Sequence, residues 1–318
     1  MGNDVSIQPA ATAPQSAAGH AAAPAIPNPS APVHIALAAC CAVLIAFCWI
    51  AAPPGALHDA GMLFLGVLLL MAIFQLPAVY WHHRGSAERR DAALMLPWAL
   101  MLALLMAQMA RTAATFTFPL RDDLWRNLDQ HLGISVPAMM AWAARWPWIR
   151  TLLADSYALV QPMLLCGIFL PPLFGRRESA ERFMVANAVA FVIALPIVVF
   201  FPAVGPWVGW HFAPDTMQHI CEMSIDSLRT GSIRGGLFGG TICLPSFHVF
   251  WAVVSAHALY SFRLLRYPAI VLAALITVGT MTTGWHYGVD VISGFLLAAI
   301  STWIATMITR MGRRPAQA

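Results

Sequence analysis

Charged residues are scarce in this sequence of 318 residues: they make up 10% of it, whereas hydrophobic residues make up 59%. Soluble domains usually carry about 25% charged residues, and so few charges could not cover the surface of a soluble protein of this length with polar groups. A lipid bilayer removes that requirement because its hydrocarbon tails solvate apolar side chains. The composition therefore excludes an ordinary soluble domain and indicates an integral membrane protein.

Further absences narrow the possibilities. No basic segment precedes an apolar core in residues 1–33, so we expect no signal peptide there; their Ala-, Pro- and Ser-rich composition predicts a disordered tail. No CxxC or Cys/His spacing typical of zinc sites occurs. The net charge of +4 is small, and its basic residues stand in short connections, which argues against a nucleic-acid partner.

The six cysteines fall into two groups. Cys221 and Cys243 flank one polar connection, where a disulfide would be feasible if the connection lies outside the cytoplasm. The other four lie in apolar stretches and are interpreted as small buried hydrophobic residues: Cys40, Cys41, Cys48 and Cys166.

Long apolar stretches are abundant, and eight of them could cross about 30 Å of hydrocarbon. They cover residues 34–52, 61–81, 92–110, 155–174, 183–201, 245–262, 268–285 and 287–308. We therefore expect an all-α fold, a polytopic membrane bundle of about eight transmembrane helices. The transmembrane domain would span residues 34–310 and be followed by a cytoplasmic tail, 311–318.

Arginine clusters follow every second apolar stretch and predict the orientation. They comprise Arg84, Arg89 and Arg90, then Arg176, Arg177 and Arg182, then Arg263 and Arg266, and finally Arg310, Arg313 and Arg314. By the positive-inside rule these ends and both termini are cytoplasmic, and the long connections 111–154 and 202–244 lie outside. Tryptophans in the first connection predict an interfacial helix, either an anchor or an entry lip for a lipid substrate.

Two polar passages lie at the predicted outer boundary: Cys243-Leu-Pro-Ser-Phe-His248 and Thr283-Gly-Trp-His-Tyr-Gly-Val-Asp290. His286 and Asp290 are four residues apart and would share one helix face. The carboxylate would hold one imidazole nitrogen and leave the other free to attack or bind. We therefore expect the rings of His248 and His286 to converge on a shared anion pocket.

The first passage has the features of a phosphate cradle. Pro245 suits the first turn of a helix, and the amides that follow favour an anion. Ser246 adds a hydroxyl, and His248 could give a proton to a leaving oxygen.

Together, Pro-Ser-x-His and His-x-x-x-Asp followed by Gly294 resemble the type-2 phosphatidic acid phosphatase superfamily. The resemblance covers about residues 243–296 and is closest to the branch that includes inositol phosphorylceramide synthases, which the passage Phe201–Pro206 also resembles. It implies a bundle with that family's core and a phosphoric monoester hydrolase or phosphotransferase that acts on a lipid phosphate among membrane lipids.

The resemblance also implies roles for four residues. His286 would take the phosphoryl group as a phosphohistidine, Asp290 would orient it, His248 would protonate the leaving alkoxide and Ser246 would help to hold the phosphate. No metal or other cofactor is implied.

The sequence departs from the family pattern in its cations. The Lys and Arg-Pro motif is absent, and Gly279 and Thr280 stand where Ser-Arg is usual. Phosphoryl transfer requires positive charge near the equatorial oxygens. Arg229 and Arg234 are the candidate substrate-binding cations, with Arg121 and Arg126 as weaker ones.

The sequence is also compatible with two other functions: a metal-dependent hydrolase that uses the same His/His/Asp cluster, and a non-enzymatic transporter or scaffold. The predicted location is a bacterial inner membrane, with the active site facing the periplasm or outside. The lipid substrate, the choice between hydrolysis and transfer to an alcohol, and the oligomeric state are left open.

Overall fold

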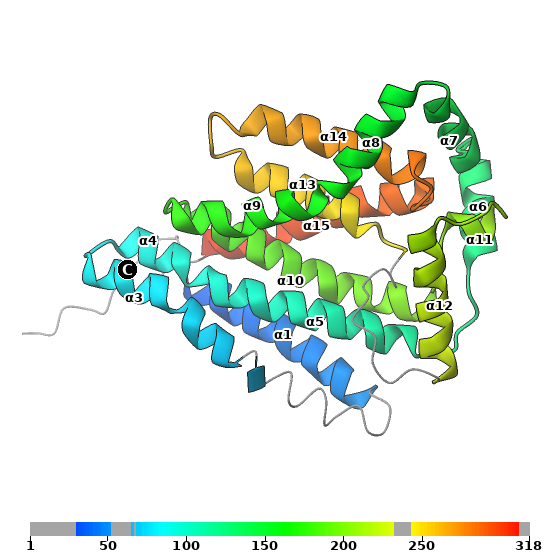
Figure 1. The fold of residues 1–318 in the computed structure, drawn as a ribbon. Helices are drawn as coiled ribbons and strands as arrows, with labels where there is room; N and C mark the ends of the chain where they lie inside the picture. Colours follow the sequence, from blue (N-terminus) through cyan, green and yellow to red (C-terminus); the bar gives the residue numbers. More distant parts are fainter. Residues whose placement is uncertain (1–29, 52–64, 67, 232–242, 312–318) are drawn as a thin grey trace, which may run out of the picture.

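The computed structural model describes residues 30–51, 65–66, 68–231 and 243–311, and all the regular elements within these ranges are helices. They are α1 (Ala31–Ile50), α3 (Leu76–His83), α4 (Ala87–Ala93), α5 (Met95–Ala114), α6 (Asp122–His131), α7 (Val136–Ala144), α8 (Pro147–Ala158), α9 (Val160–Leu173), α10 (Arg177–Phe200), α11 (Pro206–Gly209), α12 (Thr216–Thr230), α13 (Phe247–Leu259), α14 (Arg266–Thr282) and α15 (Gly288–Met311). The expected all-α membrane bundle is confirmed (Figure 1).

The expected count of eight spans is not confirmed. Among the described residues, five helical stretches are long and apolar enough to cross a membrane: Ala31–Ile50, Ala87–Ala114, Pro147–Leu173, Arg177–Phe200 and Gly288–Met311. α13 and α14 are apolar but shorter. The sequence pattern extended α13 over 245–262, but Ser246 caps the helix and the chain leaves it after Leu259. Its 13 residues therefore span only about 20 Å.

Some expected boundaries lie outside the described residues. α1 begins at Ala31, slightly before the expected boundary at 34. The rest of the expected N-terminal tail, residues 1–29, and most of the expected C-terminal tail, 312–318, are not described. The second expected span, 61–81, is described only in part.

α10 forms the centre of the bundle and packs against α1, α5, α9, α13 and α15 (Figure 1). Its buried surface includes five alanines: Ala180, Ala186, Ala188, Ala190 and Ala194. Small residues let helix backbones approach closely, which is the main source of packing between membrane helices. α10 thereby supports α13 and α15, the helices that begin at the two histidine passages.

The arginine-rich connections meet at one end of the bundle, on the left in Figure 1. The Arg176 guanidinium lies 5.8 Å from the centre of the Phe262 ring, and Nη1 of Arg182 lies 3.3 Å from Nε2 of His257. α6, α7, α11 and α12 gather at the opposite end, where α13 and α15 begin. The arginine clusters and the two histidine passages are therefore at opposite ends of the bundle, as the alternation along the sequence predicts.

Candidate active site

The two histidine passages meet where α13 and α15 begin. His248 lies in the first turn of α13, His286 in the turn before α15, and Asp290 in the first turn of α15. Nε2 of His286 lies 3.2 Å from Nδ1 of His248, and the ring centroids are 5.3 Å apart. On the other side of its ring, Nδ1 of His286 lies 3.4 Å from Oδ2 of Asp290. The expected convergence of the two imidazoles is therefore present in the structure.

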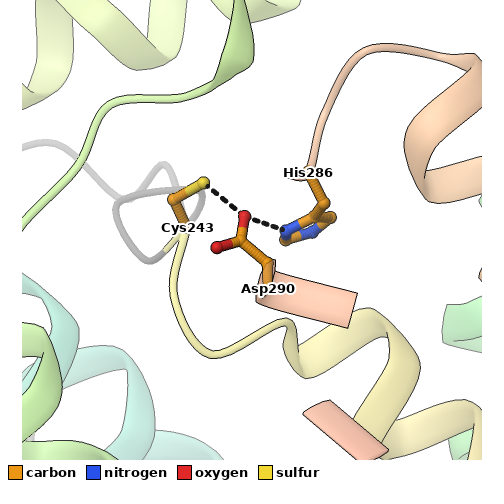
Figure 2. Close-up of side chains that lie close together, drawn as sticks. All are labelled: Cys243, His286 and Asp290. Atoms are coloured by element: carbon orange, nitrogen blue, oxygen red, sulfur yellow. Dashed lines mark hydrogen bonds and ion pairs between the residues drawn. The ribbon is translucent and has the colours of Figure 1, made fainter. Parts of the chain in front are cut away.

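Oδ2 of Asp290 is a shared acceptor (Figure 2). It accepts hydrogen bonds from the Tyr287 backbone N–H at 2.9 Å and from the Cys243 thiol at 3.0 Å. The nearby Nδ1 of His286 is not aligned for a hydrogen bond, and Oδ1 of Asp290 also has no hydrogen-bond partner among the described residues. Catalytic hydrogen bonds are often long before substrate binds, so a small ring rotation would complete the His–Asp pair.

Ser246 joins the two helices. Its Oγ caps α13 by accepting the Val249 N–H at 3.4 Å, and its own N–H donates to the Asp290 carbonyl at 3.1 Å. The helix thus begins after Ser246, and Pro245 precedes the cap instead of lying in the first turn as expected. Ser246 is fully buried, so its hydroxyl already has a structural role. Its expected contact with phosphate remains a prediction.

Gly294 allows α15 to approach the start of α13. A Cβ at this position would lie 2.7 Å from the Ser246 carbonyl oxygen and 3.0 Å from the Cβ of Val249. The first of these distances is shorter than real Cβ contacts, so any other residue would push the two helices apart. This packing gives a physical reason for the glycine that follows the His-x-x-x-Asp motif.

Two aspartates of α6, Asp122 and Asp129, hold the His286 turn in place. We call them the α6 acidic pair. Asp129 accepts the N–H of Gly288 through Oδ2 and the N–H of Val289 through Oδ1, both at 2.8 Å. Oδ1 of Asp122 lies 3.0 Å from the Tyr287 hydroxyl. The acidic pair is buried and fixes the residues on the C-terminal side of His286.

The sequence reasoning missed the acidic pair, although a signal was present. Asp122 and Asp129 are seven residues apart, close to two helical turns, so they share one face of α6. The passage Phe201–Pro206 belongs to the same network, since the N–H groups of Val204 and Gly205 donate to Asp122 at 3.1 and 2.9 Å.

Burial sets the protonation of the groups around the turn. It lowers the pKa of His286 to about 4, so the ring is neutral at pH 7. It raises the pKa of Cys243 well above its ordinary value, with the Asp290 carboxylate adding to the effect; the thiol therefore stays protonated and can donate. Burial also raises the pKa of Asp122. It raises the pKa of Asp129 to about 6, although the hydrogen bonds from the Gly288 and Val289 N–H groups act in the opposite direction.

The predicted cations are not brought to the histidines. Arg229 donates to the Phe116 and Phe118 carbonyls at 2.9 and 2.7 Å, which ties α12 to the segment after α5. Arg126 donates to the Gly209 carbonyl at 2.9 Å. In the described part of the chain, no arginine side chain hydrogen-bonds His248, His286, Asp290 or Cys243. Arg121 is exposed, and Arg234 lies outside the described residues.

The cysteines also differ from some expectations. Cys221 and Cys243 are free thiols, so the feasible disulfide is not formed, because the Cys243 thiol points to Asp290. Cys166 is exposed instead of buried. One further contact was not anticipated: the Tyr157 ring of α8 stacks on His248, with centroids 4.5 Å apart and an interplanar angle of 20°. This ring covers one face of the first histidine.

Comparison with known families decides the classification. The model of a family described as the PAP2 superfamily matches residues 123–304, more than half of the chain, and the match includes both histidine passages. The chain belongs to the PAP2 superfamily. This is the type-2 phosphatidic acid phosphatase superfamily that the motifs resemble, and membership indicates a phosphatase-type function. The match does not distinguish the branch within PAP2, and no curated protein and no solved structure gives a significant match.

Proposed function

We propose that this PAP2 protein is a membrane phosphatase or phosphotransferase that acts on a lipid phosphate through a phosphohistidine at His286. One observation carries the proposal: Nε2 of His286 faces His248 at 3.2 Å while its Nδ1 faces Asp290 at 3.4 Å. A neutral imidazole has one nitrogen that donates and one that accepts. A carboxylate beside Nδ1 favours the tautomer that leaves the Nε2 lone pair free to attack.

The chemistry then proceeds in two balanced steps. Nε2 of His286 attacks phosphorus, the bond from phosphorus to the lipid oxygen breaks, and protonated His248 gives its proton to the leaving alkoxide. Water or an alcohol next attacks the phosphohistidine, neutral His248 takes its proton, and the N–P bond breaks to release His286. Hydrolysis and transfer thus share one intermediate, and the acceptor decides between them.

Substrate binding has to separate the two rings. Attacking and leaving atoms lie roughly in line on opposite sides of phosphorus, so a phosphoryl group cannot react while the imidazoles remain 3.2 Å apart. The hydrogen bond between the rings is therefore a feature of the substrate-free site. The backbone N–H groups at the start of α13 are suitable donors for the phosphate oxygens. The chain contains no lysine, so any Lys or Arg cation at the phosphate is an arginine. Arg234 and the exposed Arg121 are the candidates that remain.

The arginine distribution supports the proposed location. Arginines at the end of the bundle opposite the histidines support a cytoplasmic assignment for that end. The site would then open to the periplasm or outside, and the substrate would come from the outer leaflet, in a bacterial inner membrane with both termini in the cytoplasm. Cysteine labelling with a membrane-impermeant reagent, at residues introduced in the α6–α7 connection, tests this orientation in intact cells.

The function is tested by release of phosphate from a panel of lipid phosphates by the purified protein, with and without alcohol acceptors. His286→Ala and His248→Ala should each abolish turnover. His257→Ala is the matched control, because this third histidine is also in α13 but contacts Arg182 at the arginine-rich end. Full activity in both active-site variants would overturn the proposal. Absence of phosphate release from the whole panel in the wild type would favour the transporter or scaffold.

A metal-dependent hydrolase is the second candidate, because Cys243, His286 and Asp290 place potential ligand atoms within 4.8 Å of one another. Exhaustive chelation separates the two mechanisms. Phosphohistidine chemistry survives EDTA, whereas a metal hydrolase loses turnover and recovers it when the metal is restored.

A further inference from the structure

Two buried polar atoms beside the catalytic histidine lack partners. Nδ1 of His286 and Oδ1 of Asp290 have no hydrogen bond among the described residues, although His286 is 3% exposed and Asp290 is fully buried. Buried polar atoms are nearly always satisfied in folded proteins. A small ring rotation would pair Nδ1 with Oδ2 of Asp290 but would leave Oδ1 without a partner among the described residues. The carboxylate is therefore able to accept a further ligand.

A third atom completes the arrangement. Sγ of Cys243 lies 3.0 Å from Oδ2 of Asp290, and Nδ1 of His286 lies 3.4 Å from the same oxygen (Figure 2). Tetrahedral zinc holds nitrogen and oxygen at about 2.0 Å and sulfur at about 2.3 Å, which places its ligand atoms about 3.3–3.6 Å apart. The third pair, Sγ of Cys243 and Nδ1 of His286, lies within 4.8 Å, so the two side chains would close on the ion by up to about 1 Å to reach this geometry.

We propose that Cys243, His286 and Asp290 form a binding site for a thiophilic divalent cation, with Zn²⁺ as the expected occupant, and that the ion inhibits the enzyme. A thiolate and an imidazole favour Zn²⁺, whereas Mg²⁺ and Ca²⁺ require oxygen ligands. Three protein ligands also leave a fourth position open for water.

Inhibition follows from the proton balance. Zn²⁺ displaces the Cys243 thiol proton to solvent and forms bonds to Sγ, to Nδ1 of His286 and to an Asp290 oxygen. The ring proton moves from Nδ1 to Nε2, so the lone pair that would attack phosphorus is lost. Asp290 is also removed from its orienting position. Binding of the ion does not depend on the proposed function, but inhibition does.

The binding test uses the purified full-length protein, stripped with EDTA and titrated with Co²⁺, whose thiolate complexes have a charge-transfer absorption. The wild type should develop this absorption, and excess Zn²⁺ should remove it. Cys243→Ser and Cys243→Ala should lack it, while Cys166→Ser, which alters an exposed cysteine, should keep it. No absorption in the wild type, or an undiminished one in both Cys243 variants, would overturn the proposal. Size-exclusion profiles show that each variant is folded.

Activity provides the second readout. Zn²⁺ should inhibit phosphate release reversibly with EDTA, and Mg²⁺ should not. The rate of each Cys243 variant is compared with its own metal-free rate. The Zn²⁺ concentration that halves this rate should be about 100-fold higher than for the wild type. Loss of a group that only supports the metal ligands already lowers metal affinity about 10–100-fold. Equal sensitivity in variants and wild type would contradict the site. A protein that binds Co²⁺ as predicted but releases no phosphate would instead refute the proposed function.

Discussion

Asp129→Asn separates the effect of positioning the His286 turn from the effect on stability. The wild-type carboxylate accepts two N–H groups, from Gly288 and Val289, both at 2.8 Å. An asparagine keeps one acceptor and turns an NH₂ group toward the other N–H. The N–H group that faces the NH₂ loses its acceptor, which costs about 1–3 kcal/mol. Against this, the pKa of Asp129 is raised from 3.8 to about 6 even with both N–H groups bound. Relative to a neutral side chain, the buried charge therefore costs roughly 3 kcal/mol at pH 7, with the two hydrogen bonds already included.

These two effects nearly cancel, so the free energy of unfolding should change by no more than about 1–2 kcal/mol. Activity should respond differently, because displacement of a catalytic group by about 1 Å can cost about 100-fold in rate. We expect kcat/KM for a lipid phosphate to fall about 10- to 100-fold. Asp123→Asn is the control, since Asp123 lies on the same helix with 76% of its side chain exposed.

The pH profile supplies a signature that a purely structural residue would lack. The folded-state pKa of Asp129 is raised, so its contribution to stability is complete below about 3.8 and is lost as the pH rises through about 6. Activity has the opposite dependence, because both N–H groups are held only by the ionised carboxylate. Wild-type kcat/KM should therefore fall as the pH drops below about 6, and this limb should vanish in Asp129→Asn. A variant with wild-type kcat/KM and an unchanged profile would refute this reasoning.

Two other substitutions test contacts around the site. In Gly294→Ala the new Cβ would meet the Ser246 carbonyl. Overpacking of this kind should destabilise the protein by about 1–3 kcal/mol and lower phosphatase activity at least about tenfold. Unchanged activity and melting temperature would show that the two helices can separate freely. Arg229→Ala should lower stability by about 0.5–1.5 kcal/mol, because two hydrogen bonds to the Phe116 and Phe118 carbonyls are lost and water can replace the exposed one. KM should not change. A large rise in KM at normal stability would instead support the substrate contact predicted from the sequence.

Sequence patterns predicted the parts of the site that depend on local spacing and on membrane orientation. His286 and Asp290 are four residues apart, and the alternating arginines placed His248 on the same side as His286. The second inference needs only the positive-inside rule. The first assumed a shared helix face, but His286 lies in the turn before α15 and still faces Asp290. The 3.2 Å approach of the two rings also depends on the packing of α15 against the start of α13.

The remaining contacts join segments that are remote in sequence, and no local pattern indicates them. Asp129 meets Gly288 and Val289 across about 160 positions, and a single sequence carries no record of such a pairing. Cys243 was considered as half of a disulfide because it bordered a polar connection, but its thiol is a donor to Asp290. Span lengths were overestimated at α13, because hydropathy does not register that Ser246 starts the helix.

Trapping of the reaction intermediate tests the central claim most directly. The purified protein is mixed with a lipid phosphate labelled on phosphorus and quenched during turnover, and its peptides are then mapped. The label should be acid-labile and should lie on the peptide that contains His286, with none in His286→Ala. Turnover that proceeds without label on this histidine, or with label on another residue, would contradict the account.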